Sequence, residues 1–106
     1  MSRPRVKAPK TAKAGEIVTI KTLISHPMES GQRKDESGAV IPRKIIHRFT
    51  AEFNGQTIFA MDLAPSISAN PFIEFQFRVN ESGELKMSWH EDGGEVFTDS
   101  KTITVQ

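Results

Sequence analysis

Apolar residues recur at every second position in several segments of this chain. Between residues 73 and 79, four apolar side chains alternate with Glu74, Gln76 and Arg78, and similar alternation covers residues 85–90 and 101–105. Successive side chains of a β-strand point to opposite faces, so this pattern predicts strands with one buried and one solvated face. No segment shows a sustained helical period. The sequence therefore predicts an all-β protein.

Turn residues divide the alternating segments. Asn54-Gly55 predicts a type I′ hairpin, Glu81-Ser82-Gly83 and residues 91–94 predict two further hairpins, and residues 64–71 predict a short 3₁₀ turn or crossover between two prolines. We expect about seven strands, at residues 3–8, 16–25, 44–53, 56–63, 72–80, 84–90 and 95–105. That number in a chain of 106 residues predicts one domain, residues 1–106, with an immunoglobulin-like antiparallel β-sandwich fold.

Six of the eight aromatic residues carry a prediction, five for the core and one for the surface. Five of them fall on the rows that should face inward: Phe49, Phe53, Phe75, Phe77 and Trp89. Phe72 and Ile46 instead fall on the polar rows of their strands. An exposed apolar side chain on such a row indicates a surface that contacts a partner.

The connection between residues 25 and 44 is unusually long. Connections in compact domains usually have about 2–6 residues, so a longer one is functional, disordered or wrongly assigned. This one contains His26 and Met28 near its start and Arg33, Lys34, Arg43 and Lys44 further along. We expect it to be partly ordered by a partner or to contribute to the contact with one. The alternative is that Met28, Ile41 and Pro42 only cover the end of the sandwich.

The net charge of +1 conceals an asymmetry between the two halves of the chain. Residues 1–53 contain eleven Lys and Arg against five Asp and Glu, whereas residues 54–106 contain three against eight. Five basic residues precede the first acidic one: Arg3, Arg5, Lys7, Lys10 and Lys13. Such a basic cluster can attract an acidic partner and accelerate its association. Ordinary solvated surface charge is an equally good interpretation.

The composition argues against most kinds of active site. The chain has no cysteine, and its histidines, His26, His47 and His90, lack the HxH or HxxxH spacing of zinc ligands. There is no nucleophile elbow, no phosphate-binding glycine loop, no aromatic residue interleaved with the basic ones, and no apolar run long enough to cross a membrane. We therefore expect no enzyme, no cofactor, no nucleic-acid ligand and no membrane span. Two alternatives remain: a copper-binding sandwich protein that uses His26 and Met28, and an adhesion-type sandwich domain.

The long connection and its flanks resemble SoxZ, a family of sulfur-oxidation proteins. The most distinctive similarity is the string His-Pro-Met-Glu-Ser-Gly-Gln-Arg-Lys-Asp at residues 26–35, followed by Ile-Pro-Arg-Lys-Ile-Ile at 41–46. The resemblance continues through Phe53-Asn54-Gly55, residues 68–72, residues 81–83 and Trp89, and covers residues 3–104. The chain departs from the family at three positions. The family often has Thr at the position of Ser30, and Tyr at the positions of Phe53 and Phe72.

The resemblance implies a non-catalytic subunit of a carrier heterodimer for thiosulfate oxidation. SoxZ pairs with SoxY, whose cysteine near the C-terminus carries the substrate covalently, and two heterodimers can associate. The carrier then contacts a haem protein, a manganese hydrolase and a sulfane dehydrogenase. The resemblance also implies a periplasmic location. Since residues 1–7 do not resemble a signal peptide, we expect export in a folded complex with SoxY.

These considerations select eleven candidate partner-binding residues. They come from the long connection, its two flanks and the exposed apolar positions: His26, Pro27, Met28, Glu29, Gln32, Arg33, Pro42, Arg43, Lys44, Ile46 and Phe72.

Overall fold

The computed structural model describes residues 3–26, 28–63 and 70–106, and the described part of the chain is built from β-strands. Within these residues there is no helix that is long and apolar enough to cross a membrane. The strands are β1 (Pro4–Lys7), β2 (Thr11–Ala12), β3 (Glu16–Ile24), β4 (Ile46–Phe53), β5 (Gln56–Asp62), β6 (Phe72–Val79), β7 (Gly83–Glu91) and β8 (Val96–Val105).

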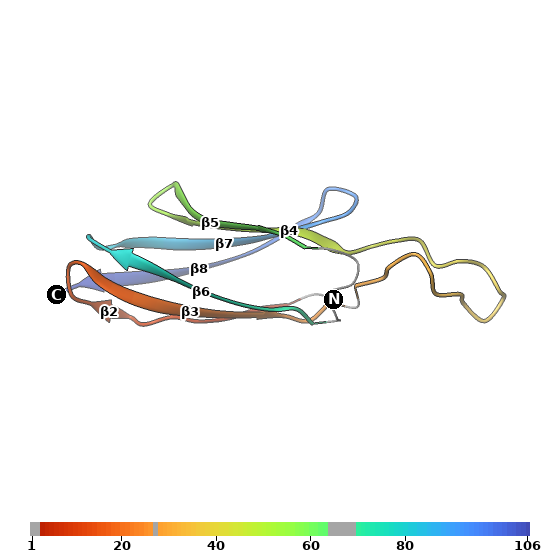
Figure 1. Cartoon of the computed structure of the whole chain (residues 1–106), viewed down its shortest axis with the longest axis horizontal. Coiled ribbons are helices and arrows are strands. Elements are labelled where there is room, and N and C mark those ends of the chain that lie inside the picture. Colours follow the sequence, from red (N-terminus) through yellow and green to blue (C-terminus); the bar gives the residue numbers. More distant parts are fainter. Residues whose placement is uncertain (1–2, 27, 64–69) are drawn as a thin grey trace.

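The strands form two sheets that pack face to face (Figure 1). One sheet has the order β1-β3-β6 and the other the order β2-β8-β7-β4-β5. The predicted all-β, immunoglobulin-like sandwich is confirmed, and each of the seven predicted strands is present. The two-residue strand β2 was not predicted. It pairs in parallel with Thr104 and Val105 of β8, so the chain passes from one sheet to the other between β1 and β2.

Aromatic rings fill the space between the sheets. Trp89 and Phe49 are fully buried, with ring centroids 5.1 Å apart, and Phe75 lies 5.9 Å from Phe49. Phe53 is buried as well, whereas Phe77 is half-buried against it. The predicted core is therefore confirmed, with Phe77 at its margin. Burial of such rings stabilises a fold through both their apolar area and their tilted contacts.

Two of the three predicted hairpins are present. Asn54 and Gly55 both have positive φ, 53° and 81°, as a type I′ turn between β4 and β5 requires. The turn between β7 and β8 uses Gly93 and Gly94, whose φ values are 93° and 95°. The predicted hairpin at residues 81–83 is wrong, because β6 and β7 belong to different sheets. The predicted turn at 64–71 lies mostly outside the described residues.

The first part of β4 departs from strict alternation. Ile46 pairs with Glu91 and Arg48 pairs with His90, so His47 is an extra residue in a β-bulge. The bulge shifts the alternation by one position, and both Ile45 and Ile46 are fully buried. The prediction that Ile46 is an exposed partner-binding residue is therefore wrong, since its side chain belongs to the core.

Candidate partner-binding surfaces

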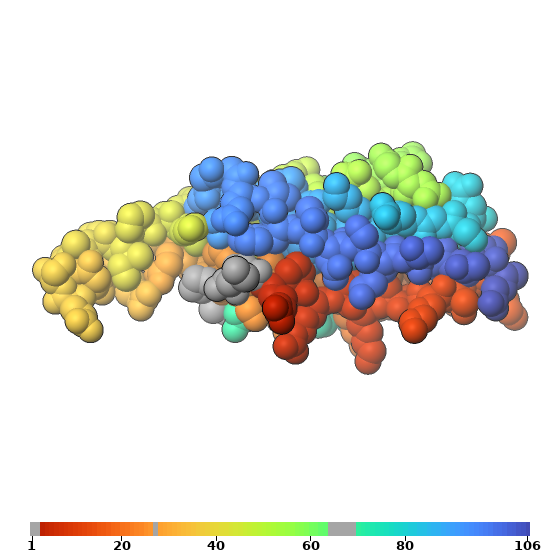
Figure 2. Space-filling view, turned by 180° about the vertical axis from the view of Figure 1, so that it is seen from behind, coloured from red at the N-terminus to blue at the C-terminus, as the bar shows by residue number. Residues whose placement is uncertain are grey.

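Residues 25–44 are here called the arm, and its described residues project beyond one end of the sandwich (Figures 1 and 2). The molecule is 58 Å long but only 20 by 19 Å across. Glu29 and Lys44 exchange two backbone hydrogen bonds of 3.0 and 2.7 Å, and the N–H of Ile41 donates to Arg33 at 2.7 Å. The described part of the arm therefore consists of two segments, here called its legs, which are joined by backbone hydrogen bonds.

The tip of the arm is closed by Asp35. Its carboxylate accepts hydrogen bonds from the hydroxyl and backbone N–H of Ser37, at 2.7 and 2.9 Å, and from the N–H of Ala39 at 3.1 Å. The hydroxyl of Ser37, together with these N–H groups, lowers the pKa of the Asp35 carboxyl. The aspartate carboxylate thus accepts hydrogen bonds from backbone N–H groups that have no backbone acceptor in the tight turn.

His26 anchors the start of the arm to both sheets. Its backbone N–H and C=O bond to Asn70, at 2.8 and 2.9 Å. Its ring Nδ1 accepts the N–H of Met28 at 2.9 Å, so the Nε2–H donates to Glu91 at 2.6 Å. The side chain is almost fully buried. His26 therefore has a structural role and cannot contact a partner directly in this conformation.

Met28 is the second anchor, and its position bears on the copper alternative. It has a positive φ of 52°, is buried, and its sulfur accepts the N–H of Ile46 at 3.4 Å. Both ring nitrogens of His26 and the sulfur of Met28 thus already have partners. Within the described residues, no group of three or more His, Cys, Asp or Glu could hold a metal ion. This arrangement counts against a copper site at His26 and Met28.

Glu91, which was expected in a hairpin turn, is only 3% exposed. One carboxylate oxygen accepts the bond from His26. The other, Oε1, is buried without a hydrogen-bond partner among the described residues and lies 3.6 Å from the Nζ of Lys44. Burial of a carboxylate is costly unless it is paired, so Lys44 and His26 together stabilise this charge. No local sequence signal distinguishes Glu91 from its half-buried neighbours, His90 and Asp92.

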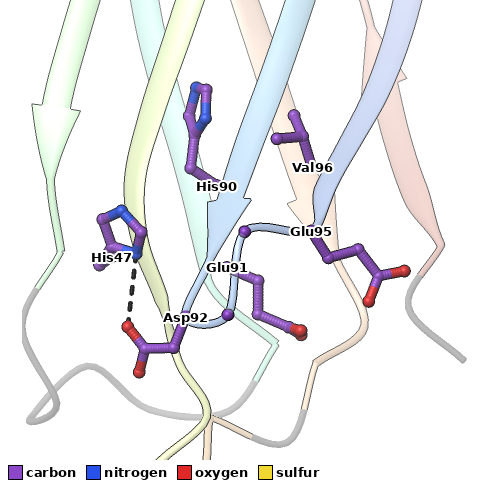
Figure 3. Close-up of a pocket in the computed structure, with 8 residues that line it drawn as sticks. His47, His90, Glu91, Asp92, Glu95 and Val96 are labelled. Carbon is purple, nitrogen blue, oxygen red and sulfur yellow. Dashed lines mark ion pairs between the residues drawn. The ribbon is translucent and has the colours of Figure 1, made fainter.

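Asp92 fastens the other leg of the arm. Its carboxylate accepts hydrogen bonds from the Nε of Arg43 at 2.9 Å and from the N–H of Ile45 at 3.2 Å. Figure 3 shows the third contact, to the Nδ1 of His47 at 3.4 Å, beside a cavity of about 330 Å³. The hydrogen bond from Arg43, with further help from Ile45 and His47, lowers the pKa of Asp92.

Most of the basic side chains on the arm are already paired. Arg33 forms an ion pair with Glu29, which raises the pKa of Arg33 and lowers that of Glu29. Arg43 pairs with Asp92, and Lys44 with Glu91. These cations stabilise the arm itself, so they are poorly suited to attract a separate acidic partner.

A second surface lies on the outer face of the β1-β3-β6 sheet, near the arm. Phe72 is 59% exposed, as predicted, and is the cross-strand neighbour of exposed Leu23. A shallow groove of about 250 Å³ runs between these apolar residues and Arg5, Lys7 and Lys21. These three cations form no ion pair with any described residue. The face therefore combines an apolar pair with three cations that form no ion pair, and Glu74 is the cross-strand neighbour of one of them, Lys21.

The predicted partner-binding residues thus fall into four groups. His26, Met28 and Ile46 are buried, Glu29 is half-buried, and Pro27 lies outside the described residues. Five residues of the arm are exposed, namely Gln32, Arg33, Pro42, Arg43 and Lys44, and Phe72 is exposed at the start of β6 opposite Leu23. Sequence reasoning missed Leu23, Arg5, Lys7 and Lys21 as parts of one surface, because only the pairing of β1, β3 and β6 brings them together.

The sequence matches the profile of the family described as Sulphur oxidation protein SoxZ over residues 6–102. The chain belongs to the SoxZ family. Its role therefore lies in Sox sulfur oxidation. None of the curated proteins matches the chain in sequence.

Several solved structures share the fold. The sulfur carrier protein SoxY from Chlorobium limicola f thiosulfatophilum has a TM-score of 0.69 and 15% identity, covering 97% of this chain and 78% of that chain. Superoxide reductase (neelaredoxin) from Ignicoccus hospitalis has a TM-score of 0.73 and 17% identity, covering 97% and 80%. A CARDB domain from Pyrococcus furiosus has a TM-score of 0.55 and 10% identity, covering 99% and 95%. At such identities these similarities concern the fold alone.

Proposed function

We propose that this chain is the non-catalytic subunit of a SoxYZ carrier, which binds a SoxY-like subunit and presents it to other enzymes. The observation that carries the proposal is the SoxZ family match over residues 6–102 in a chain without cysteine. Covalent transport of sulfur requires a thiol, so the reactive group belongs to the partner. The resemblance to SoxZ implies that this group is a cysteine near the partner's C-terminus.

The two surfaces at the arm end suit this role. The outer sheet face offers Leu23 and Phe72 for burial, and Arg5, Lys7 and Lys21 for attraction of an acidic surface. Protein interfaces combine an apolar centre with a charged margin in this way. The arm extends the molecule by an ordered element whose contacts are already formed, which reduces the entropy lost on binding.

The remaining features of the proposal concern the cellular context. The carrier works in the periplasm, and this chain is exported in a folded complex with its partner. There the carrier contacts a haem protein that attaches thiosulfate, a manganese hydrolase and a sulfane dehydrogenase in turn. Two heterodimers can associate further.

Co-expression with an affinity-tagged SoxY-like subunit tests the proposal. We expect this chain to co-purify in a stoichiometric complex and its thermal unfolding midpoint to rise on addition of the partner. A partner variant with Ser in place of its C-terminal cysteine should still bind this chain but no longer carry sulfur. A chain that stays monomeric, with an unchanged unfolding midpoint at saturating partner, would contradict the proposed function.

A further inference from the structure

Each sheet of the sandwich ends in two edge strands, and among the described residues β6 differs from the other three. β1 has four residues and begins with Pro4, β2 has two residues, and β5 adjoins a register shift at Ala51 and Glu52 of β4. Short strands, proline and bulges all hinder the addition of a foreign strand. β6 has eight residues without proline or lysine, and its register with β3 continues without a shift.

The register identifies which backbone groups of β6 face away from β3. The N–H of Ile24 donates to the C=O of Pro71, so these two residues form a hydrogen-bonded pair. Hydrogen-bonded and non-hydrogen-bonded pairs alternate in an antiparallel ladder. Ile73, Phe75, Phe77 and Val79 therefore bond to β3, whereas Phe72, Glu74, Gln76 and Arg78 direct their N–H and C=O groups to the free edge.

Apolar side chains lie on both sides of this free edge. On the outer face, Phe72 is the most exposed large apolar residue of the described chain. Between the sheets, half-buried Phe59 of β5 stacks on Phe75 with ring centroids 4.9 Å apart, and half-buried Phe77 lies next along β6. A strand added at β6 would cover both groups while completing the hydrogen bonds of the edge.

We propose that β6 binds a β-strand of the SoxY-like partner by edge addition, which rests on the proposed function. The solved SoxY from Chlorobium limicola f thiosulfatophilum has the same fold, with 78% of that chain covered. A partner of this fold also has edge strands, and two sandwiches can then share one continuous sheet. Main-chain hydrogen bonds supply affinity in this mode, and side chains such as Phe72 supply specificity.

Replacing Gln76 with Pro tests the inference directly. Gln76→Pro removes one N–H from the free edge but none from the ladder with β3. Gln76→Ala is the matched control, because both variants lose the side-chain hydrogen bond to Thr19. We expect the partner's Kd to rise about tenfold or more for Gln76→Pro and to stay close to wild type for Gln76→Ala. Equal Kd values for folded Gln76→Pro and wild type would overturn the inference.

Amide hydrogen exchange of the wild-type chain gives a second test that needs no variant. On binding, the amides of Glu74, Gln76 and Arg78 should become protected, while those of Phe75 and Phe77 are protected in both states. Partner binding with unchanged exchange at the first three would overturn edge addition but leave the proposed function intact. Wild type that fails to bind the partner would contradict the proposed function itself. Protection that rises with the concentration of the chain alone would mean that a second copy occupies the edge, against the inference.

Discussion

At the scale of single residues, His26 shows how a sequence motif can be structural. Its backbone is hydrogen-bonded to Asn70, its ring is hydrogen-bonded to Met28 and Glu91, and its side chain is buried from solvent. Within the distinctive string at residues 26–35, His26 and Met28 therefore fasten the arm to the sandwich. Direct contact with a partner is therefore left to the exposed residues that His26 and Met28 hold in place.

Replacing His26 with Ala should strongly destabilise the chain. The variant leaves the buried Glu91 carboxylate without its 2.6 Å hydrogen bond and opens a cavity at the arm base. We expect the free energy of unfolding to fall by about 3 kcal/mol, measured by urea denaturation. His47→Ala is the matched control, because the exposed His47 side chain has only a 3.4 Å contact with Asp92 and its loss should cost less than about 1 kcal/mol. Similar losses for the two variants would contradict the anchoring role of His26.

At the scale of elements, the arm depends on the turn between β7 and β8. The Glu91 carboxylate accepts a hydrogen bond from His26 on the first leg of the arm. The Asp92 carboxylate accepts hydrogen bonds from Arg43 and Ile45 at the end of the second leg. Two adjacent acidic residues thus hold both legs of the arm, although His26 lies 65 residues before Glu91 in the chain. The orientation of the arm relative to the sandwich therefore depends on the charges of this turn.

The contribution of the Arg43–Asp92 pair should depend on pH. The pKa of Asp92 is lower in the folded chain than its usual value of about 3.9, so the pair contributes stability above that value. The contribution is lost as the pH falls through the folded pKa. At pH 7, Arg43→Gln should be less stable than wild type by roughly 0.5–1 kcal/mol, and the difference should disappear at low pH. Denaturant unfolding at several pH values measures it.

Lys86→Gln is the control for this pH dependence. Lys86 is an exposed cation of β7 that forms no ion pair with the described residues. Its replacement should change stability little at any pH. If the difference between wild type and Arg43→Gln were constant from neutral to acid pH, the Arg43–Asp92 pair would not be its cause.

At the scale of the whole molecule, local patterns predicted the fold but not its long-range contacts. Some features depend only on residues that are close in the sequence, such as the alternation around Phe75 and the Asn54-Gly55 turn. The strands and that hairpin could therefore be predicted from the sequence. Burial of Ile46 depends on a bulge opposite Glu91, and β2 exists only because β8 lies beside it. The exposed surfaces require the same long-range pairing. No local pattern brings Arg5 beside Leu23, or leaves the edge of β6 free.

The charge asymmetry between the halves of the chain can also be assigned to one surface of the molecule. Three of the four cations of the arm, Arg33, Arg43 and Lys44, are paired. In contrast, Arg5, Lys7 and Lys21 form no ion pair with the described residues and surround the groove beside Phe72. Any steering of an acidic partner should therefore depend on the outer face of the β1-β3-β6 sheet more than on Arg33 and Arg43.

Reversing two of these charges should slow association with the SoxY-like partner. For Arg5→Glu/Lys21→Glu, we expect the association rate constant at low salt to fall about tenfold and its dependence on salt to weaken, because steering acts before contact. Lys86→Glu/Lys101→Glu makes the same change of charge on the other sheet and should have a much smaller effect. Stopped-flow association at several salt concentrations measures both variants. Equal rate constants for the two would contradict steering by the β1-β3-β6 face, whereas a changed dissociation rate alone would show that these side chains act only within the formed complex.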